Sequence, residues 1–181
     1  NFLTAGTSFF RDENKDRRLI ISASTPTSTN RRISTTRSVP NASLTNFAAF
    51  VQDEFRLNDR IRFIGGVRVD RFDTKSEPTT GFALPALRLD QINDLGIGNL
   101  ATGLSTTNTA VTGDFGAVVK LTEKWSATAR IGRSFRTPNI FELFFTDTGS
   151  VGGFIVGNPR LRPETGINFD TGLKYRSKHL S

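Results

Sequence analysis

The chain has 181 residues, of which 36% are hydrophobic, and it carries a formal net charge of +7 and no Cys. This length suffices for one domain, and the absence of Cys excludes disulfides and thiolate metal sites. No apolar run approaches the roughly 20 residues of a membrane-spanning helix, which excludes a helical membrane protein.

The first half of the chain predicts three strands separated by polar segments. Apolar and polar residues alternate there with period two, which indicates strands whose two faces meet different environments. The expected strands cover residues 2–11, 44–57 and 61–73. Asn58-Asp59 has the composition of a tight turn, whereas 12–43 and 74–110 have the Ser, Thr, Pro and Gly content of long loops. Asp53 interrupts the apolar face of its strand.

The second half predicts three further strands. The alternation returns in three segments, which are 114–121, 125–136 and 164–175. A short turn at 122–124 joins the first two of them. The connection 137–163 contains three prolines, each of which removes a backbone donor, and we expect a shaped loop there.

Long and short connections alternate strictly along the chain, as they do in an up-and-down barrel of an outer membrane. The low hydrophobic share fits this fold, because only every second strand residue faces lipid. Arg62, Arg68, Asp70 and Arg130 lie on the polar faces, which a wide barrel turns toward a wet lumen. We therefore predict an all-β fold, with about six antiparallel up-and-down strands of a transmembrane outer-membrane β-barrel and long extracellular loops.

Two motifs flank the connection 137–163. They are RTPN at 136–139 with ELF at 142–144, and GNPRLRPE at 157–164. Together with NFAAFVQDEFRLNDRIRFIGGVRVD at 46–70, they resemble the TonB-dependent outer-membrane receptors. The matching stretches cover a minority of the chain and occur in the order in which that family has them.

The resemblance implies an outer-membrane receptor of a bacterium that takes up scarce nutrients such as ferric siderophores, haem or cobalamin. It also implies coupling to the TonB complex through an N-terminal plug domain, and it implies further strands. Six strands are too few to close a lipid-embedded barrel, and no signal-peptide pattern is present. We therefore expect residues 1–181 to be part of a receptor barrel domain without its plug.

A ferric siderophore is the first expectation for the ligand. Many siderophores are anionic, and segment 11–43 has seven Lys or Arg against three Asp or Glu. The candidate ligand-binding residues are Arg68, Arg130, Arg136, Phe141 and Phe144. Each has a structural alternative: the inward arginines would pair with Asp70, Asp114, Asp170 or plug carboxylates, the motif at Arg136 would only end a strand and orient a loop, and the apolar residues of 140–145 would form a loop core. The basic segment would likewise be a solvated loop or contact outer-membrane lipid.

No catalytic residue, metal ligand set or cofactor is expected. His179 is the one His of the sequence, and no pattern places a nucleophile beside it. Two other interpretations stay open: a soluble basic β-domain that binds nucleic acid or acts as an adhesin, and an outer-membrane enzyme such as a lipase. The spread of basic residues among Asp and Glu argues against nucleic acid as the partner.

Overall fold

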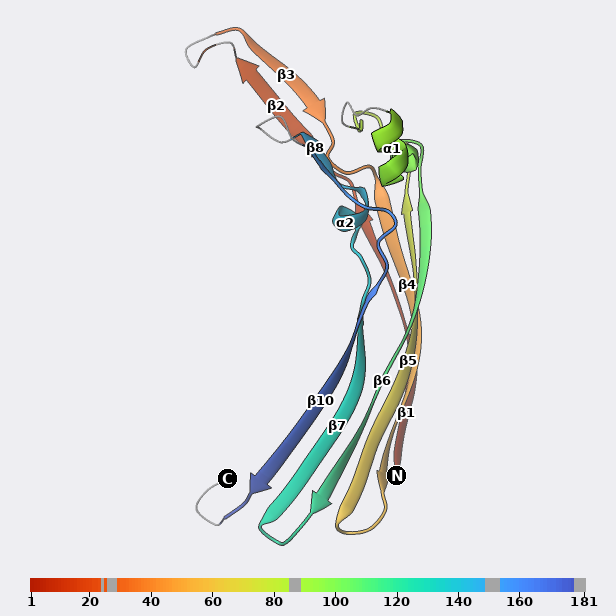
Figure 1. Cartoon of the computed structure of the whole chain (residues 1–181), viewed down its shortest axis with the longest axis vertical. Coiled ribbons are helices and arrows are strands. Elements are labelled where there is room, and N and C mark those ends of the chain that lie inside the picture. Colours follow the sequence, from red (N-terminus) through yellow and green to blue (C-terminus); the bar gives the residue numbers. More distant parts are fainter. Residues whose placement is uncertain (24, 26–28, 85–88, 149–153, 178–181) are drawn as a thin grey trace.

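The computed structural model describes residues 1–23, 25, 29–84, 89–148 and 154–177. One antiparallel sheet of six strands, in the order β1-β4-β5-β6-β7-β10, dominates the chain (Figure 1). These strands are β1 (Phe2–Asn14), β4 (Ala42–Arg56), β5 (Ile61–Ser76), β6 (Ser105–Lys120), β7 (Trp125–Arg136) and β10 (Glu164–Tyr175). The six predicted strands are confirmed, and β1, β5 and β6 extend beyond their predicted ends into the connections.

The strand register brings the apolar positions of all six strands onto one face, here called the outward face. Val51 lies opposite Val67, and Phe115 lies opposite Ile131, which in turn lies opposite Phe169. Phe169 keeps 70% of its surface exposed. A domain surrounded by water would bury such a continuous apolar face, so this face requires an apolar partner.

The buried core lies at one end of the sheet and not between its strands. Its fully buried members include Leu100, Leu143 and Phe144, from the long connections. Ile167 and Leu173, which a closed dry core would bury, are 79% and 64% exposed. The apolar side chains of the strands therefore do not meet in a dry centre, as predicted, and the packed part of the chain is the loop end.

The long connections contain regular elements that the sequence analysis described only as loops, and that description is corrected. Their polar composition hid short elements that are stabilised by contacts between connections rather than by periodicity. These are the hairpin of β2 (Arg18–Ala23) and β3 (Arg31–Thr36), α1 (Leu89–Leu95), η1 (Gly98–Leu100), α2 (Ile140–Phe144), β8 (Thr146–Thr148) and β9 (Phe154–Val156).

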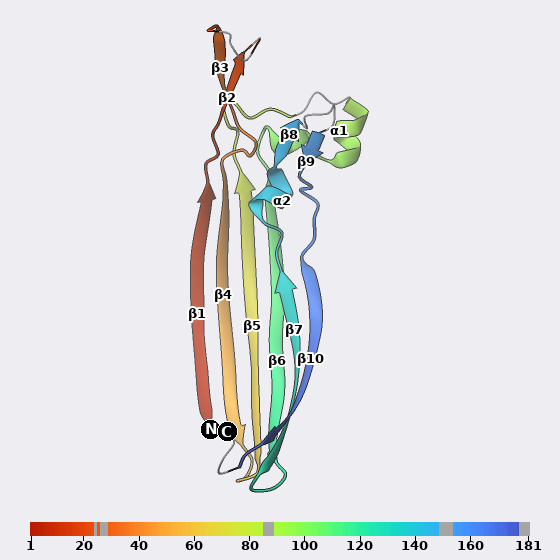
Figure 2. The same ribbon diagram turned by 90° about the vertical axis from the view of Figure 1, so that its left-hand side faces the viewer.

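Long and short connections lie at opposite ends of the sheet, as predicted. The helices and the β2–β3 hairpin gather at one end, and the short turns lie at the other, where β1 begins and β10 ends (Figure 2). Trp125 and Tyr175 lie opposite each other at the short-turn end, with ring centroids 4.8 Å apart. Such aromatic pairs are typical of a membrane interface. None of the described helices has the length and apolar character needed to cross a bilayer, a result that concerns helices only.

Asp53 is a carboxylate within the apolar band of the outward face, and it provides a first prediction. It lies between Leu3 and Gly65, and its Oδ1 is buried without a hydrogen-bond partner. Because an unpaired carboxyl on this face costs free energy, Asp53→Leu should raise the free energy of unfolding by about 1–2 kcal/mol. Denaturant titration of the full receptor in phospholipid vesicles measures this change. Gln52→Leu, on the other face, is the control, and an equal gain there would contradict the prediction.

Candidate functional site

The inward face of the sheet carries a polar hollow of about 550 Å³. It is lined by residues of β4, β5, β6, β7 and β10, Gly116 among them. The charged and polar side chains that line it are Gln52, Asp114, Thr128, Arg130 and Asp170. A wide, wet hollow with both charges fits a surface that faces the lumen of a barrel.

Three arginines of the inward face are paired with carboxylates. Arg68 Nε lies 2.8 Å from Asp70 Oδ2, and Arg130 Nε lies 3.1 Å from Asp114 Oδ2. Asp70 and Asp114 are two of the partners that the sequence analysis named for the inward arginines as a group. Arg62 pairs at 2.9 Å with Glu54, a partner that the sequence analysis did not name. These pairs are partly exposed, so each contributes little to stability and mainly fixes where its charges lie.

Arg68 belongs to a network that ties three strands together near the loop end. Its Nη2 donates to Asp70 Oδ1 at 2.8 Å and to Ser8 Oγ of β1 at 3.0 Å. Asn46 of β4, which is fully buried, donates from Nδ2 to the same carboxylate at 3.1 Å. The network holds β1, β4 and β5 in register beneath the packed loops, and it gives Arg68 a structural role besides any contact with ligand.

Arg136 joins the two motifs that carried the family resemblance. Its Nη2 lies 2.7 Å from Glu142 Oε1 and its Nη1 lies 3.1 Å from Oε2, a bidentate pair. Its Nε lies 3.3 Å from Glu164 Oε2, at the start of β10. One guanidinium thus bridges both ends of the connection 137–163.

The same connection is fixed through helix capping. Asn139 Oδ1 accepts from the backbone N–H of Glu142, and Glu142 Oε2 accepts from the backbone N–H of Asn139, both at 2.9 Å. This reciprocal capping box stabilises the N-terminus of α2, which has only five residues. The hydrogen bonds from Arg136 and then from the Asn139 backbone lower the pKa of Glu142 below its ordinary value.

The second motif closes over α2 through its backbone. The N–H of Gly157 donates to Phe145 O at 2.6 Å, and the N–H of Asn158 donates to Glu142 O at 2.8 Å. We call Arg136, Asn139, Glu142, Gly157, Asn158 and Glu164 the loop clasp. The two motifs are therefore one structural unit, although 157–164 lies about twenty residues from 136–139 in sequence.

Gly157 permits this closure because a side chain would not fit there. A Cβ at Gly157 would lie 2.7 Å from the carbonyl carbon of Leu143. Gly157→Ala should therefore lower the local stability of the clasp by about 1–3 kcal/mol, because the backbones must separate. Hydrogen exchange of the amides of α2 measures this. Gly98→Ala, whose Cβ would meet Ile92 at an ordinary 3.5 Å, is the control. Unchanged exchange in Gly157→Ala would contradict the close approach.

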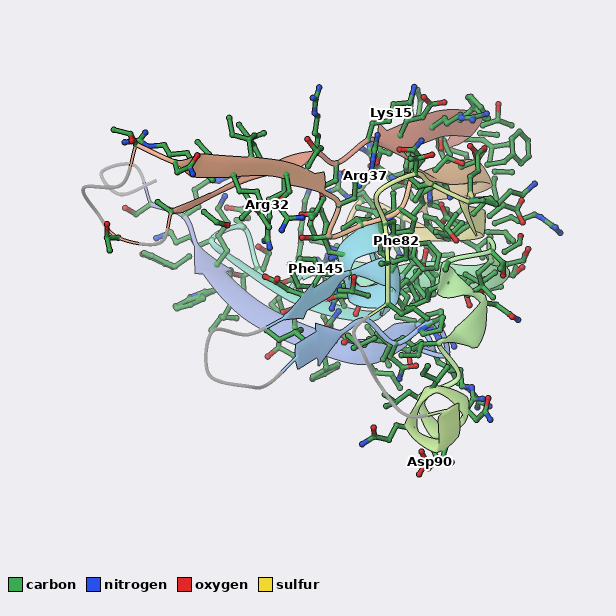
Figure 3. The ribbon with its side chains drawn as sticks, turned by 90° about the horizontal axis from the view of Figure 1, so that it is seen from above. Lys15, Arg32, Arg37, Phe82, Asp90 and Phe145 are labelled. Atoms are coloured by element: carbon green, nitrogen blue, oxygen red, sulfur yellow. The ribbon has the colours of Figure 1, made fainter. Side chains whose placement is uncertain are left out.

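The aromatic candidates of α2 differ in exposure. Phe144 is fully buried in the loop-end core, whereas Phe141 is 54% exposed. Viewed from above, α2 lies inside the curve of the sheet, near Phe82 and Phe145, whereas Asp90 of α1 lies well away (Figure 3). The alternative in which the apolar segment forms a loop core thus describes Phe144, and Phe141 is the ring that α2 offers to solvent.

The β2–β3 hairpin is held at its base and exposed beyond it. Arg18 pairs with Asp147 through bonds of 2.8 and 3.2 Å, which raises the pKa of Arg18 above its ordinary value. Asp16 Oδ2 accepts from the backbone N–H of Ser38 at 2.7 Å. Arg17 at this base, and Arg31 and Arg32 further along the hairpin, are exposed and make no ion pair with any described residue. These three are here called the hairpin arginines.

Sequence reasoning missed the contacts between connections. Arg18 and Asp147 are separated by 129 positions, and no local pattern announces such a pair. The capping box did carry a signal, because Asn139 and Glu142 have its three-residue spacing. The sequence analysis named both residues as parts of a motif but did not predict a capping box from their spacing. His179 lies outside the described residues.

Comparisons with known proteins agree with the geometry. A curated relative, the ferric enterobactin receptor PirA of Pseudomonas aeruginosa, is 31% identical over 104 residues, which cover 51% of this chain and 12% of the relative. Among solved structures, the copper transporter OprC superposes with a TM-score of 0.67 at 20% identity, over 97% of this chain and 26% of OprC. The Serratia marcescens hemophore receptor HasR, solved as a double mutant with its hemophore HasA and heme, gives 0.55 at 14% identity, over 93% and 28%.

The chain thus spans 12% of the length of the curated relative and 26% and 28% of the two solved structures, which share its fold. The family model described as TonB dependent receptor-like, beta-barrel, matches residues 1–181, which is the whole chain. Members of this family are transporters and receptors of Gram-negative outer membranes. The outward apolar wall, the inward polar hollow and this match establish that the chain belongs to the TonB-dependent receptor β-barrel family.

Proposed function

We propose that this chain forms part of the wall of an outer-membrane receptor that takes up a scarce nutrient with energy supplied through TonB. The observation that carries the proposal is the orientation of the sheet. Its outward apolar face is open to lipid, and its inward face holds a polar hollow with paired charges. A plug domain and further strands, outside these 181 residues, would complete the barrel. No reaction is required, because the work is capture and passage of a ligand.

A ferric siderophore is the ligand class that we propose. The curated relative is a ferric enterobactin receptor, which favours an iron chelate over the copper and heme named for the two structural neighbours. The exposed hairpin arginines would attract an anionic chelate at the loop end. Deeper along the path, Arg130 is the candidate in the hollow, and Arg136 and Phe141 are the exposed candidates near the clasp.

Uptake by the complete receptor tests this proposal. Cells that carry the full-length gene should accumulate radioactive iron from ferric enterobactin, and cells without the gene or without TonB should not. Copper and heme supplied separately serve as competing ligands. If the receptor is found in the outer-membrane fraction and takes up copper or heme but no ferric siderophore, the transport proposal stands and the siderophore proposal fails. If the receptor is absent from the outer-membrane fraction, both the transport proposal and the siderophore proposal fail.

The soluble alternatives lose support for a physical reason. A nucleic-acid-binding domain or adhesin in water would cover Phe9, Ile167 and Phe169, yet these are 68–79% exposed. Arg62, Arg68 and Arg130 of the inward face are each paired with a carboxylate, which leaves less free positive charge for a phosphate backbone. The enzyme alternative depends on His179, outside the described residues, and no observation favours it.

A further inference from the structure

The apolar band of the outward face ends toward the loops in a row of arginine and threonine. On the three strands that run toward the loops, an arginine lies two positions beyond the last exposed apolar residue of that face. These pairs are Phe9–Arg11, Val69–Arg71 and Ile131–Arg133. On the three strands that run away from the loops, a threonine lies two positions before the first such residue. These pairs are Thr45–Phe47, Thr109–Val111 and Thr165–Ile167.

We call these six polar residues the arginine rim. The register places Arg11 directly opposite Thr45 and Arg71 directly opposite Thr109. Opposed side chains on one face of a sheet begin about 5 Å apart, so a guanidinium and a hydroxyl can bind the same anion. Arg133 lies further down the register. Because barrel strands tilt by about 35–45°, residues at the same depth in the membrane are offset along the register from one strand to the next.

The rim arginines keep donors available. Arg11 lies 3.0 Å from Glu13 and Arg71 lies 3.1 Å from Asp73, and both carboxylates are one outward position further from the apolar band. Arg133 is exposed and makes no ion pair with any described residue. A guanidinium has five N–H donors, so one carboxylate leaves several of them unused. The free donors lie at the edge of the apolar band.

The other edge of the band is different. At the short-turn end, the outward face ends in the aromatic pair Trp125 and Tyr175. Among the described strand residues, no Lys or Arg lies on that face at that end. General solubility would not place cations at one edge only, and this asymmetry indicates an anionic partner on the loop side of the band.

We propose that the arginine rim binds the phosphate groups of outer-leaflet glycolipid whose acyl chains cover the apolar band below. The inference rests on the proposed placement in the outer membrane. The guanidinium fork matches phosphate geometry, and threonine adds a hydroxyl donor. Arginine at the edge of a bilayer keeps its stem on apolar surface while its head reaches the phosphate level. The adjoining apolar band favours lipid as the source of the phosphate over a free anion.

Lipid binding by the full-length receptor in detergent provides the test, with bis-phosphorylated lipid A as the probe. The triple variant Arg11→Gln, Arg71→Gln, Arg133→Gln should bind the probe more weakly by on the order of 100-fold, since each basic side chain near anionic lipid contributes about fivefold. The triple variant Arg56→Gln, Lys120→Gln, Lys174→Gln removes the same charge from the inward face at the short-turn end. This control should bind lipid A as the wild type does.

Two comparisons need only the wild-type receptor. Dephosphorylated lipid A should bind far more weakly than the probe, and millimolar inorganic phosphate should not displace the probe. Equal binding of the dephosphorylated lipid, displacement by inorganic phosphate, or equal loss in the two triple variants would each overturn the proposal. Failure of ferric siderophore uptake leaves these binding results intact, and absence of the receptor from the outer membrane is detected separately by fractionation.

Discussion

Ala129→Arg should lower the free energy of unfolding of the full receptor by about 2–4 kcal/mol, whereas Thr128→Arg should cost about 1 kcal/mol or less. The two residues are neighbours on β7 and lie on opposite faces of the sheet. Ala129 lies between Ala117 and Thr171 on the outward face, midway along the apolar band of β7. Its replacement by arginine puts a charge at lipid depth. Thr128 lines the inward hollow, where water solvates an added guanidinium.

Reversible guanidinium titration in phospholipid vesicles measures both variants, and heat-modifiable migration on gels reports the folded fraction. The two variants introduce the same residue at adjacent positions of the same strand, so they differ only in the face of the sheet that carries the arginine. Equal costs at the two positions would show that the faces do not meet different solvents. A larger loss of unfolding free energy at Thr128 would mean that the apolar residues face the interior of the barrel. The proposed function, which depends on the opposite orientation, would then fail.

Arg136→Gln should open the loop clasp without unfolding the sheet. It removes the bidentate pair with Glu142 and the bridge to Glu164, so α2 and the second motif lose their common partner. Because these groups are exposed, we expect only about a two- to tenfold fall in the hydrogen-exchange protection of α2. Arg162→Gln in the same connection is the control and should leave protection unchanged. Equal protection in both variants would show that Arg136 does not hold the connection.

The clasp should also respond to pH through Glu142. Its pKa in the folded chain lies below the ordinary value of 4.5, mainly because Arg136 donates to its carboxylate. Its contribution is therefore complete above pH 4.5 and is lost as pH falls through the lower, folded-state value. Protection of α2, corrected for intrinsic exchange, should decline in that acid range in wild type and much less in Arg136→Gln. A decline of the same size in both would place the titrating group elsewhere.

Local patterns were sufficient for the wall and insufficient for the loops. The six strands followed from period two, because a strand between lipid and lumen must alternate along its whole length. The hairpin β2–β3 and helix α2 have no comparable constraint, because each packs on other connections. The family motifs marked where the clasp lies, but they did not show that Arg136 bridges Glu142 and Glu164.

Among the ligand candidates, the structure distinguishes positions that the sequence treated alike. Phe141 and Phe144 are three positions apart in one apolar segment, yet the first is exposed and the second is fully buried. Burial depends on what packs against a helix from elsewhere in the chain, and for α2 this includes the loop-end core around Leu100. Arg68 and Arg130 likewise differ, since the first is held in a three-strand network and the second lines the open hollow.

By itself, the sequence of this protein determined the six strands of the main sheet, the two faces of that sheet and the separation of long loops from short turns. These follow from periodicity and turn chemistry, which act over a few neighbouring residues. Only the tertiary structure decided the clasp, the inward pairings such as Arg62 with Glu54, and the alignment of the arginine rim across six strands. Those features depend on register and on contacts between distant connections, because a side chain's partner across a sheet is set by strand pairing and not by its neighbours in sequence.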